Sequence, residues 1–213
     1  MMKNYKHIIW DWNGTLFNDV ELCVDIINNL LTKKGLNKLT LKDYKDKFTF
    51  PIKDYYRNIG FDFKKYTFEN LGNEWIEEYE FRKYEAYLFN NTTKVLKYFS
   101  NNFIAQSILS AYSQNTLIAT IEYFNLQNYF TYIIGLNHVY ATSKIEIGKE
   151  LLEKMKENSR EVLLIGDTAH DYEVANDLNI DCVLIANGHQ SKKKLINLGI
   201  PVLDEISEII KLF

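Results

Sequence analysis

Short apolar runs alternate with amphipathic stretches over most of the chain. Runs rich in β-branched residues predict strands over residues 5–10, 103–109, 132–136, 162–165, 182–185 and 201–203. Apolar positions three and four residues apart predict helices over residues 92–99, 113–124, 144–156 and 170–178, near residue 195 and over 206–212. Strands that alternate with helices in this way are typical of a parallel sheet covered on both faces.

Residues from about 17 to 88 follow a different pattern, with helical periodicity and no obvious strand. Asn18 or Asp19 can cap the first helix of this block, and Thr40 can cap the second. Two further helices are predicted over residues 52–59 and 67–84.

These patterns predict the fold class and the division into domains. We expect an α/β protein with a Rossmann-like, doubly wound parallel sheet built from residues 1–16 and 90–213. Residues 17–89 form an insertion directly after the first strand, and we expect them to fold as a helical cap domain. Hinges of this cap are expected near Leu16-Phe17 and Phe89-Asn90.

Composition and charge narrow the class of function. The 213 residues include 25 Lys and Arg against 28 Asp and Glu, a net charge of −3, which does not support a nucleic-acid-binding footprint. No apolar run is long enough to span a bilayer, and the N-terminal residues lack the apolar region of a signal peptide. We therefore expect a cytoplasmic protein, a monomer or a homodimer, with its two cysteines buried and reduced.

Chemically distinctive residues follow the predicted strands. Asp11 ends the first strand, Ser110 ends the second, and Lys144 begins the helix after the third. Asp167 and Asp171 follow the fourth strand. Because the carboxyl ends of parallel strands meet at one edge of the sheet, we expect these side chains to lie together.

The residue types at this edge suit phosphoryl transfer. Two carboxylates held close repel each other and favour a shared cation, and Mg²⁺ prefers oxygen ligands and phosphate oxygens. Asp11 can also act as a nucleophile, while Ser110 can donate to a phosphoryl oxygen and Lys144 supplies a positive charge. At Gly14 the backbone can approach an anion closely.

With these residues in this order, the chain resembles the haloacid dehalogenase superfamily of phosphohydrolases. The resemblance rests on Asp-Trp-Asn-Gly-Thr-Leu at residues 11–16, on Ser110 and Lys144, and on Gly-Asp-Thr-Ala-His-Asp at residues 166–171. It covers essentially the whole chain. The helical insertion looks like the family's C1-type cap, as in members similar to phosphoglycolate phosphatase.

The resemblance implies a Mg²⁺-dependent phosphatase that acts on a small phosphorylated metabolite through an aspartyl-phosphate intermediate. Asp11 would be the nucleophile and a metal ligand, joined by the backbone carbonyl of Asn13, by Asp167, and by Asp171 either through water or by orienting Lys144. The groups expected to hold the phosphoryl group are Gly14, Thr15, Ser110, Ala111 and Lys144.

One position departs from the family pattern. Most family phosphatases carry a second Asp two residues after the nucleophile, where it acts as general acid and base, but this chain has Asn13, which cannot titrate. Three interpretations remain open. The chain can be a phosphatase that obtains its proton elsewhere, a cleaver of C–P bonds similar to phosphonoacetaldehyde hydrolases, or a weakly active relative that binds a phosphorylated ligand or a partner.

Weaker candidates lie in the cap and in two loops. Lys53 and Arg57 are one helical turn apart and are candidates for substrate binding, although an exposed charged face is at least as common an explanation. Lys53 would be the Schiff-base lysine of the C–P interpretation. His170 lies between two acids and could carry a proton, but a surface position is more usual there, and we interpret His189 as a loop residue.

Overall fold

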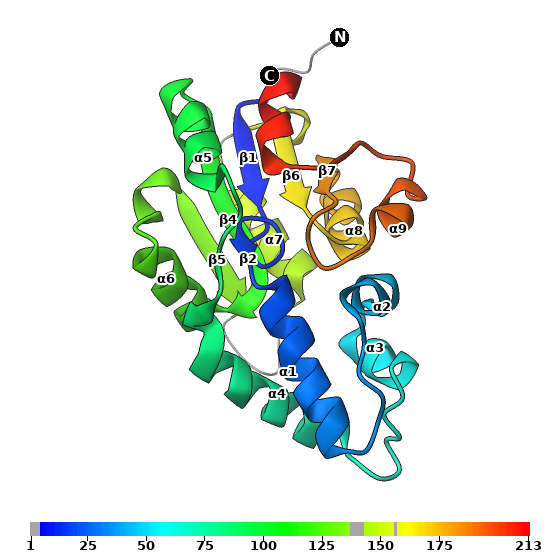
Figure 1. Ribbon diagram of the computed structural model, residues 1–213. Helices are drawn as coiled ribbons and strands as arrows, with labels where there is room; N and C mark the ends of the chain where they lie inside the picture. Colours follow the sequence, from blue (N-terminus) through cyan, green and yellow to red (C-terminus); the bar gives the residue numbers. More distant parts are fainter. Residues whose placement is uncertain (1–4, 137–142, 156) are drawn as a thin grey trace.

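The computed structural model describes residues 5–136, 143–155 and 157–213. Its main feature is a six-stranded parallel sheet with strand order β5-β4-β1-β6-β7-β8. The strands are β1 (His7–Trp10), β4 (Ala105–Ser113), β5 (Tyr132–Leu136), β6 (Val162–Gly166), β7 (Asp181–Ile185) and β8 (Val202–Leu203). The α/β doubly wound fold expected from the sequence is confirmed (Figure 1).

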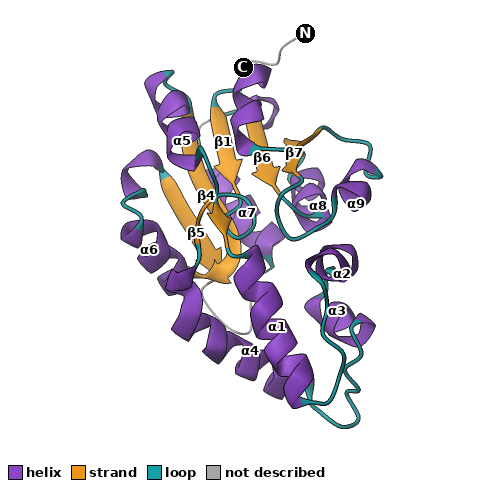
Figure 2. Cartoon of the chain, in the orientation of Figure 1, coloured by secondary structure: helices purple, strands orange, loops and turns teal. Residues whose placement is uncertain are grey.

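Helices cover both faces of this sheet (Figure 2). One face packs against α5 (Thr92–Asn101), α6 (Gln114–Tyr123) and the 3₁₀ helix η4 (Ile206–Leu212). The other packs against α7 (Lys144–Lys154), α8 (Ala169–Asp177) and α9 (Lys192–Ile196).

The pleat of β1 explains why both faces are apolar. Ile8 and Trp10 belong to the core on one face, whereas Ile9 belongs to the core on the other. All three side chains are fully buried. A strand with no solvent-exposed face therefore has a continuous apolar sequence.

Four helices separate β1 from the rest of the sheet along the chain. They are α1 (Val20–Lys33), α2 (Leu41–Lys47), α3 (Ile52–Asn58) and α4 (Phe68–Arg82), and the 3₁₀ turn η1 (Lys83–Glu85) follows them. Figure 1 shows them beyond the carboxyl ends of the strands, the edge that carries Asp11. Among the residues that the structure describes, no helix has the length and apolar character needed to cross a membrane.

The structure corrects the expectation that residues 17–88 contain no strand. Phe17–Asn18 (β2) pairs antiparallel with Tyr87–Leu88 (β3), so the chain leaves and re-enters the sheet domain through one short ribbon. Two-residue strands leave no periodicity that a sequence window can detect. Backbone bonding continues beside this ribbon, where the Phe89 N–H donates to the Leu16 carbonyl at 3.0 Å.

Two further differences concern the ends of elements. β4 was expected to end at Ser110 but runs to Ser113, and its pairing with β5 shifts register between Leu109 and Ser113. The final predicted helix is a 3₁₀ helix. The N-terminal cap expected at Thr40 is confirmed, because its side chain forms a capping box with Asp43 at α2.

Phe99 and Phe103 give a matched test of this packing. The Phe99 side chain is fully buried under the sheet, whereas Phe103 is 97% exposed. We expect Phe99→Ala to lower the free energy of unfolding by about 3–5 kcal/mol. Phe103→Ala should change it by no more than about 0.5 kcal/mol. Chemical denaturation of both variants measures this, and equal losses would contradict the core assignment.

Candidate active site

Asp11 and Asp167 meet at the carboxyl ends of two adjacent strands. β1 and β6 pair in register, with Trp10 opposite Ile165, so the residues that follow these strands are neighbours. The Asp11 N–H donates to the Ile165 carbonyl at 2.8 Å. Later strands are added on opposite sides of this pair, β4 and β5 beside β1, and β7 and β8 beside β6. Open α/β sheets bind ligands at the position where the strand order reverses in this way.

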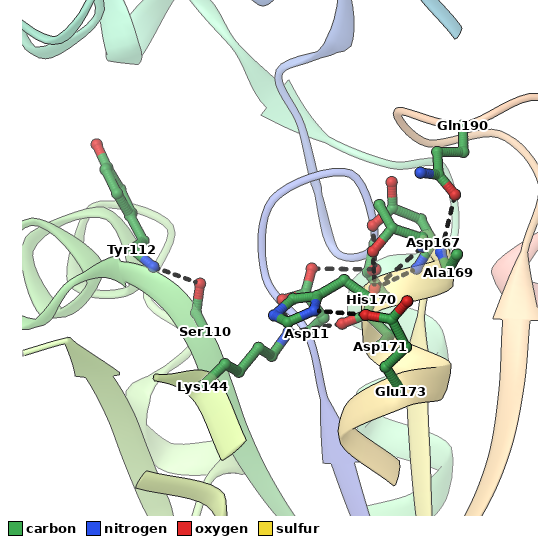
Figure 3. Close-up of polar contacts among 12 residues, drawn as sticks. Asp11, Ser110, Tyr112, Lys144, Asp167, Ala169, His170, Asp171, Glu173 and Gln190 are labelled. Atoms are coloured by element: carbon green, nitrogen blue, oxygen red, sulfur yellow. Dashed lines mark hydrogen bonds and ion pairs between the residues drawn. The ribbon is translucent and has the colours of Figure 1, made fainter. Parts of the chain in front are cut away.

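A third carboxylate joins them from the first turn of α8. Asp171 accepts hydrogen bonds at Oδ2 from the Asp167 N–H (3.2 Å), the Thr168 N–H (3.0 Å) and the Thr168 hydroxyl (2.7 Å). Carboxylate oxygens of Asp11, Asp167 and Asp171 all lie within 4.8 Å of one another, and the three residues are buried. Figure 3 shows them gathered between β1 and β6.

Lys144 provides the positive charge of this cluster. It is the first residue of α7, whose start is fixed by a capping box between Ser143 and Glu146. The buried ammonium donates to Asp11 Oδ1 and, at 2.6 Å, to Asp171 Oδ1 (Figure 3). Asp171 therefore orients Lys144 directly, which was one of the two roles expected for it.

Burial and neighbouring charges shift the pKa values of these three carboxyl groups. Burial raises the pKa of Asp11, Lys144 opposes the rise, and Asp171 and Asp167 add to it, so that the pKa is about 8. Burial also raises the pKa of Asp167, to about 6, against the attraction of His189. Burial also acts to raise the pKa of Asp171, but the attraction and hydrogen bond of Lys144 together with the hydrogen bonds from Thr168 outweigh it and lower the pKa.

A divalent cation suits this geometry. Mg²⁺ binds oxygen ligands at about 2.1 Å, so opposite ligands of one octahedral ion are about 4.2 Å apart. The carboxylate oxygens of the three residues lie within 4.8 Å of one another, which is close to that spacing. They offer only oxygen, and together with Lys144 they carry net negative charge in a buried place. A cation there would favour the charged forms of Asp11 and Asp167.

The turn after β1 packs tightly against Asp167. Gly14 has φ of +79°, and a Cβ there would collide with the Asp167 carboxylate and the His189 ring. The hydroxyl of Thr15 lies 3.4 Å from Asp11 Oδ2 and 3.3 Å from Asp167 Oδ1. Thr15 thus stands between the two carboxylates, as a supporting residue of the motif should.

The expected phosphoryl-binding residue Ser110 lies near the cluster but outside its hydrogen bonds. It is buried in the irregular part of β4, and its Oγ accepts the Tyr112 N–H at 3.1 Å. Figure 3 shows Ser110 and Tyr112 to one side of Lys144. None of the described hydrogen bonds joins Ser110 or its neighbour Ala111 to Asp11.

Lys53 and Arg57 are not brought to this cluster. Both are exposed on α3, with their cationic groups 5.7 Å and 5.6 Å from the centre of the Phe63 ring. Arg57 also pairs with Asp54. In the described part of the chain, neither residue contacts Asp11.

The Asn13 side chain points into a second buried network that the sequence did not reveal. Its Nδ2 donates to Asp19 Oδ2 at 2.9 Å and to the Tyr79 hydroxyl at 2.8 Å. Asn18 or Asp19 was expected to cap α1, and Asp19 does occupy the N-cap position. Its side chain, however, makes no capping bond and instead accepts from the Tyr79 hydroxyl at 2.6 Å. A sequence window cannot distinguish a capping acid from one that turns inward.

His189, interpreted from the sequence as a loop residue, belongs to the same network. The ring is buried, with Nε2 3.1 Å from Asp19 Oδ1 and Nδ1 2.9 Å from the Tyr44 hydroxyl. Its backbone N–H donates to Asp167 Oδ2. Burial lowers the pKa of His189, but Asp19, with help from Asp167 and Asp11, raises it to about 9. The other candidate histidine, His170, stacks on Phe50 at 4.7 Å.

Asp19, Cys23 and His189 also have ligand atoms within 4.8 Å of one another. Both Asp19 oxygens and both ring nitrogens of His189 already have hydrogen-bond partners in the protein. The pKa of His189 is raised to about 9, so its ring is protonated at neutral pH and offers no lone pair to a metal, and we interpret this second cluster as a hydrogen-bonded network.

Comparison with known proteins gives a family and a fold. The family model described as haloacid dehalogenase-like hydrolase matches residues 8–185. No curated protein sequence matches the chain significantly.

The chain is also similar to solved structures, all at low identity. A predicted phosphatase from Clostridium acetobutylicum is 19% identical with TM-score 0.81, and 97% of each chain is covered. A predicted phosphoglycolate phosphatase from Haemophilus somnus is 15% identical with TM-score 0.76, over 100% of this chain and 99% of that one. Protein tyrosine kinase A from Mycobacterium tuberculosis is 16% identical with TM-score 0.81, over 98% of each chain. At these identities the likeness shows a shared fold.

Asp167 can be tested as a metal ligand without any substrate. We expect saturating Mg²⁺ to stabilise the wild-type protein by RT ln(1 + [Mg²⁺]/Kd), about 2.7 kcal/mol at a hundred times Kd. Asp167→Asn should abolish this gain, whereas Asp177→Asn, an exposed position at the end of α8, should retain it. Denaturation with Mg²⁺ or with EDTA measures both, and an undiminished gain in Asp167→Asn would exclude Asp167 as a ligand.

Asn13→Asp would place a second carboxylate in hydrogen-bond contact with Asp19. We expect this substitution to lower the free energy of unfolding by about 1–3 kcal/mol. The double variant Asn13→Asp/Asp19→Asn exchanges donor and acceptor across the same bond and should recover part of the loss. A double-mutant cycle by chemical denaturation measures the coupling, and purely additive losses would show that the two side chains do not interact.

Proposed function

The chain belongs to the haloacid dehalogenase-like hydrolase family, and we propose that it is a Mg²⁺-dependent phosphatase acting on a small phosphorylated metabolite. The observation that carries this proposal is the buried set of Asp11, Asp167 and Asp171 around the Lys144 ammonium. Phosphoryl transfer requires mainly positioning and charge neutralisation, which these groups can supply. The phosphatases among the structural neighbours are consistent with it, and the kinase shows that fold alone does not fix the activity.

Asp11, Asp167 and the backbone carbonyl of Asn13 would hold the metal. When bound, Mg²⁺ would supply positive charge that offsets the negative charge of the transferring phosphoryl group. Asp171 would act mainly through Lys144, because its two oxygens are already occupied by the start of α8 and by the ammonium.

Asp11 would act as the nucleophile. A carboxylate oxygen of Asp11 forms a bond to phosphorus while the bond from phosphorus to the leaving oxygen breaks, giving an aspartyl-phosphate. Water then attacks this phosphorus, inorganic phosphate is released, and the Asp11 carboxylate is regenerated. Lys144, which contacts Asp11 directly, is placed to balance charge on the phosphoryl oxygens, with Ser110, Ala111 and the turn at Gly14 and Thr15 around them.

Residues 17–89 would be the cap that covers this site. Helices α1–α4 lie at the edge of the sheet that carries Asp11, and they join it through the β2–β3 ribbon (Figure 1). A cap in this position would exclude water from the reacting groups and select the substrate. We place the enzyme in the cytoplasm, as a monomer or homodimer.

The two alternative functions receive less support. C–P bond cleavage of this type would need a Schiff-base lysine from the cap beside the acidic cluster, but the candidate Lys53 lies exposed over the Phe63 ring. A weakly active binding protein would use the same cluster without turnover. A Mg²⁺-dependent assay of turnover with p-nitrophenyl phosphate and a panel of phosphorylated metabolites distinguishes such a binding protein from a phosphatase.

Removal of the nucleophile is the direct test. We expect Asp11→Asn to reduce phosphatase turnover to background, since the amide cannot form the aspartyl-phosphate. The exposed substitution Asp177→Asn should retain wild-type turnover. Phosphatase activity that survives in purified Asp11→Asn would contradict the proposed mechanism, and a wild-type protein without turnover on the whole panel would favour the binding protein.

The missing acid at residue 13 predicts a dependence on the leaving group. General acid catalysis contributes about 10²–10⁴-fold. Aryl and acyl phosphates have leaving groups that depart without a proton, so we expect their kcat/KM to exceed that of alkyl phosphates by about 10²-fold or more. Steady-state kinetics on matched aryl and alkyl esters measures the ratio. Equal values would show that another group supplies the proton.

A further inference from the structure

The carboxylate of Asp19 joins parts of the molecule that are distant in sequence. Only 2% of this residue is exposed. Its Oδ2 accepts from Asn13 Nδ2 at 2.9 Å, from the Tyr79 hydroxyl at 2.6 Å and from Cys23 Sγ at 3.5 Å, and its Oδ1 lies 3.1 Å from His189 Nε2. Asp19 is not part of the Asp11, Asp167 and Asp171 cluster, and although it is the N-cap residue of α1 its side chain makes no capping hydrogen bond, so another explanation is needed for a buried charge at this position.

Asp19 lies at the start of the helical segment, directly before α1, and one side of its carboxylate contacts α4. Tyr79 lies on α4, 60 residues after Asp19 in the sequence, and its hydroxyl is hydrogen-bonded to both Asp19 and Asn13. The three side chains thus form a closed triangle between the nucleophile motif and the proposed cap. Tyr79 is itself buried and stacks on Trp75 at 4.9 Å, so its hydroxyl is held in place.

The other side of Asp19 leads to the metal cluster. Asp19 and Tyr44 hold the His189 ring from opposite edges, and the backbone N–H of the same residue donates to Asp167 Oδ2. The position of His189 therefore helps to set the orientation of the Asp167 carboxylate. Hydrogen bonds of this kind to a metal ligand typically change metal affinity when they are removed.

We propose that Asp19 is a positioning residue that couples closure of the helical cap to the metal-binding orientation of Asp167. Asp19 and Tyr79 both bond to Asn13, and Asp19 and Tyr44 both bond to His189. Asp19, Tyr44 and Tyr79 belong to residues 17–89, whereas Asn13 and His189 belong to the core, so these contacts are present together only when the helical segment lies against the core. This rests on the proposed function, in which Asp167 holds Mg²⁺ and residues 17–89 form the cap. By reciprocity, Mg²⁺ at Asp167 then stabilises the closed cap to the same degree.

Tyr79→Phe and Tyr55→Phe form a matched pair for the test. Each removes one hydroxyl from a buried tyrosine of the proposed cap. The Tyr79 hydroxyl bonds to Asp19 and Asn13, whereas the Tyr55 hydroxyl has no hydrogen-bond partner among the residues that the structure describes. Neither residue is a metal ligand under the proposed function. Calorimetric titration with Mg²⁺ alone, without substrate, measures the affinity of each folded variant.

We expect Tyr79→Phe to weaken Mg²⁺ binding by about fivefold or more, and Tyr55→Phe to leave it within about twofold of wild type. His189→Asn, which loses the side of the ring that faces Asp19, should weaken it as well, and His189→Gln should restore part of the affinity. In the wild type, Mg²⁺ should also slow hydrogen exchange of the α4 amides, and this slowing should be smaller in Tyr79→Phe.

The outcomes separate the two proposals. If the wild type binds Mg²⁺ and Tyr79→Phe binds it equally well, the coupling is overturned while the proposed metal site stands. If Tyr79→Phe and Tyr55→Phe weaken binding equally, the effect belongs to cap packing in general and the role of Asp19 is also overturned. If the wild type binds no Mg²⁺, the metal site of the proposed function fails first, and the coupling fails with it.

Discussion

Three carboxylates buried at one edge of a parallel sheet must be compensated, and the structure around them is organised by that requirement. Asp11, Asp167 and Asp171 cannot all ionise in a dry place unless charges and donors face them. Lys144, at the start of α7, donates hydrogen bonds to Asp11 and Asp171. Backbone N–H groups at the start of α8 and at His189 supply further donors. The remaining negative charge makes a divalent cation the natural occupant.

The same electrostatic reasoning explains the neutral side chain at residue 13. Asn13 donates to a carboxylate at Asp19, and a second carboxylate at residue 13 would repel it across the same short distance. The departure from the usual family motif is thus accompanied by an acid six residues later, ion-paired with His189. Membership of the family therefore shows a hydrolase-like chain and does not specify the route of the proton.

The helical segment contributes aromatic and phenolic groups to this region. Tyr44 and Tyr79 bond to members of the buried network, and Phe48 and Phe50 pack on His189 and His170. These contacts combine apolar packing with a small number of directed hydrogen bonds. A helical segment packed in this way lies against a polar region and still leaves few buried polar groups without partners among the described residues.

The sequence by itself determined the parallel α/β fold, the helical insertion and the strand ends that bring Asp11 and Asp167 together. These depend on local periodicity and on the rule that parallel strands end at one edge. Only the tertiary structure decided the β2–β3 ribbon, the continuation of β4 past Ser110, and the contacts of Asp19 with Tyr79 and His189. The reason is physical: those contacts join residues 60 and 170 positions apart, and whether a polar side chain caps its own helix or turns inward depends on partners that no local window contains.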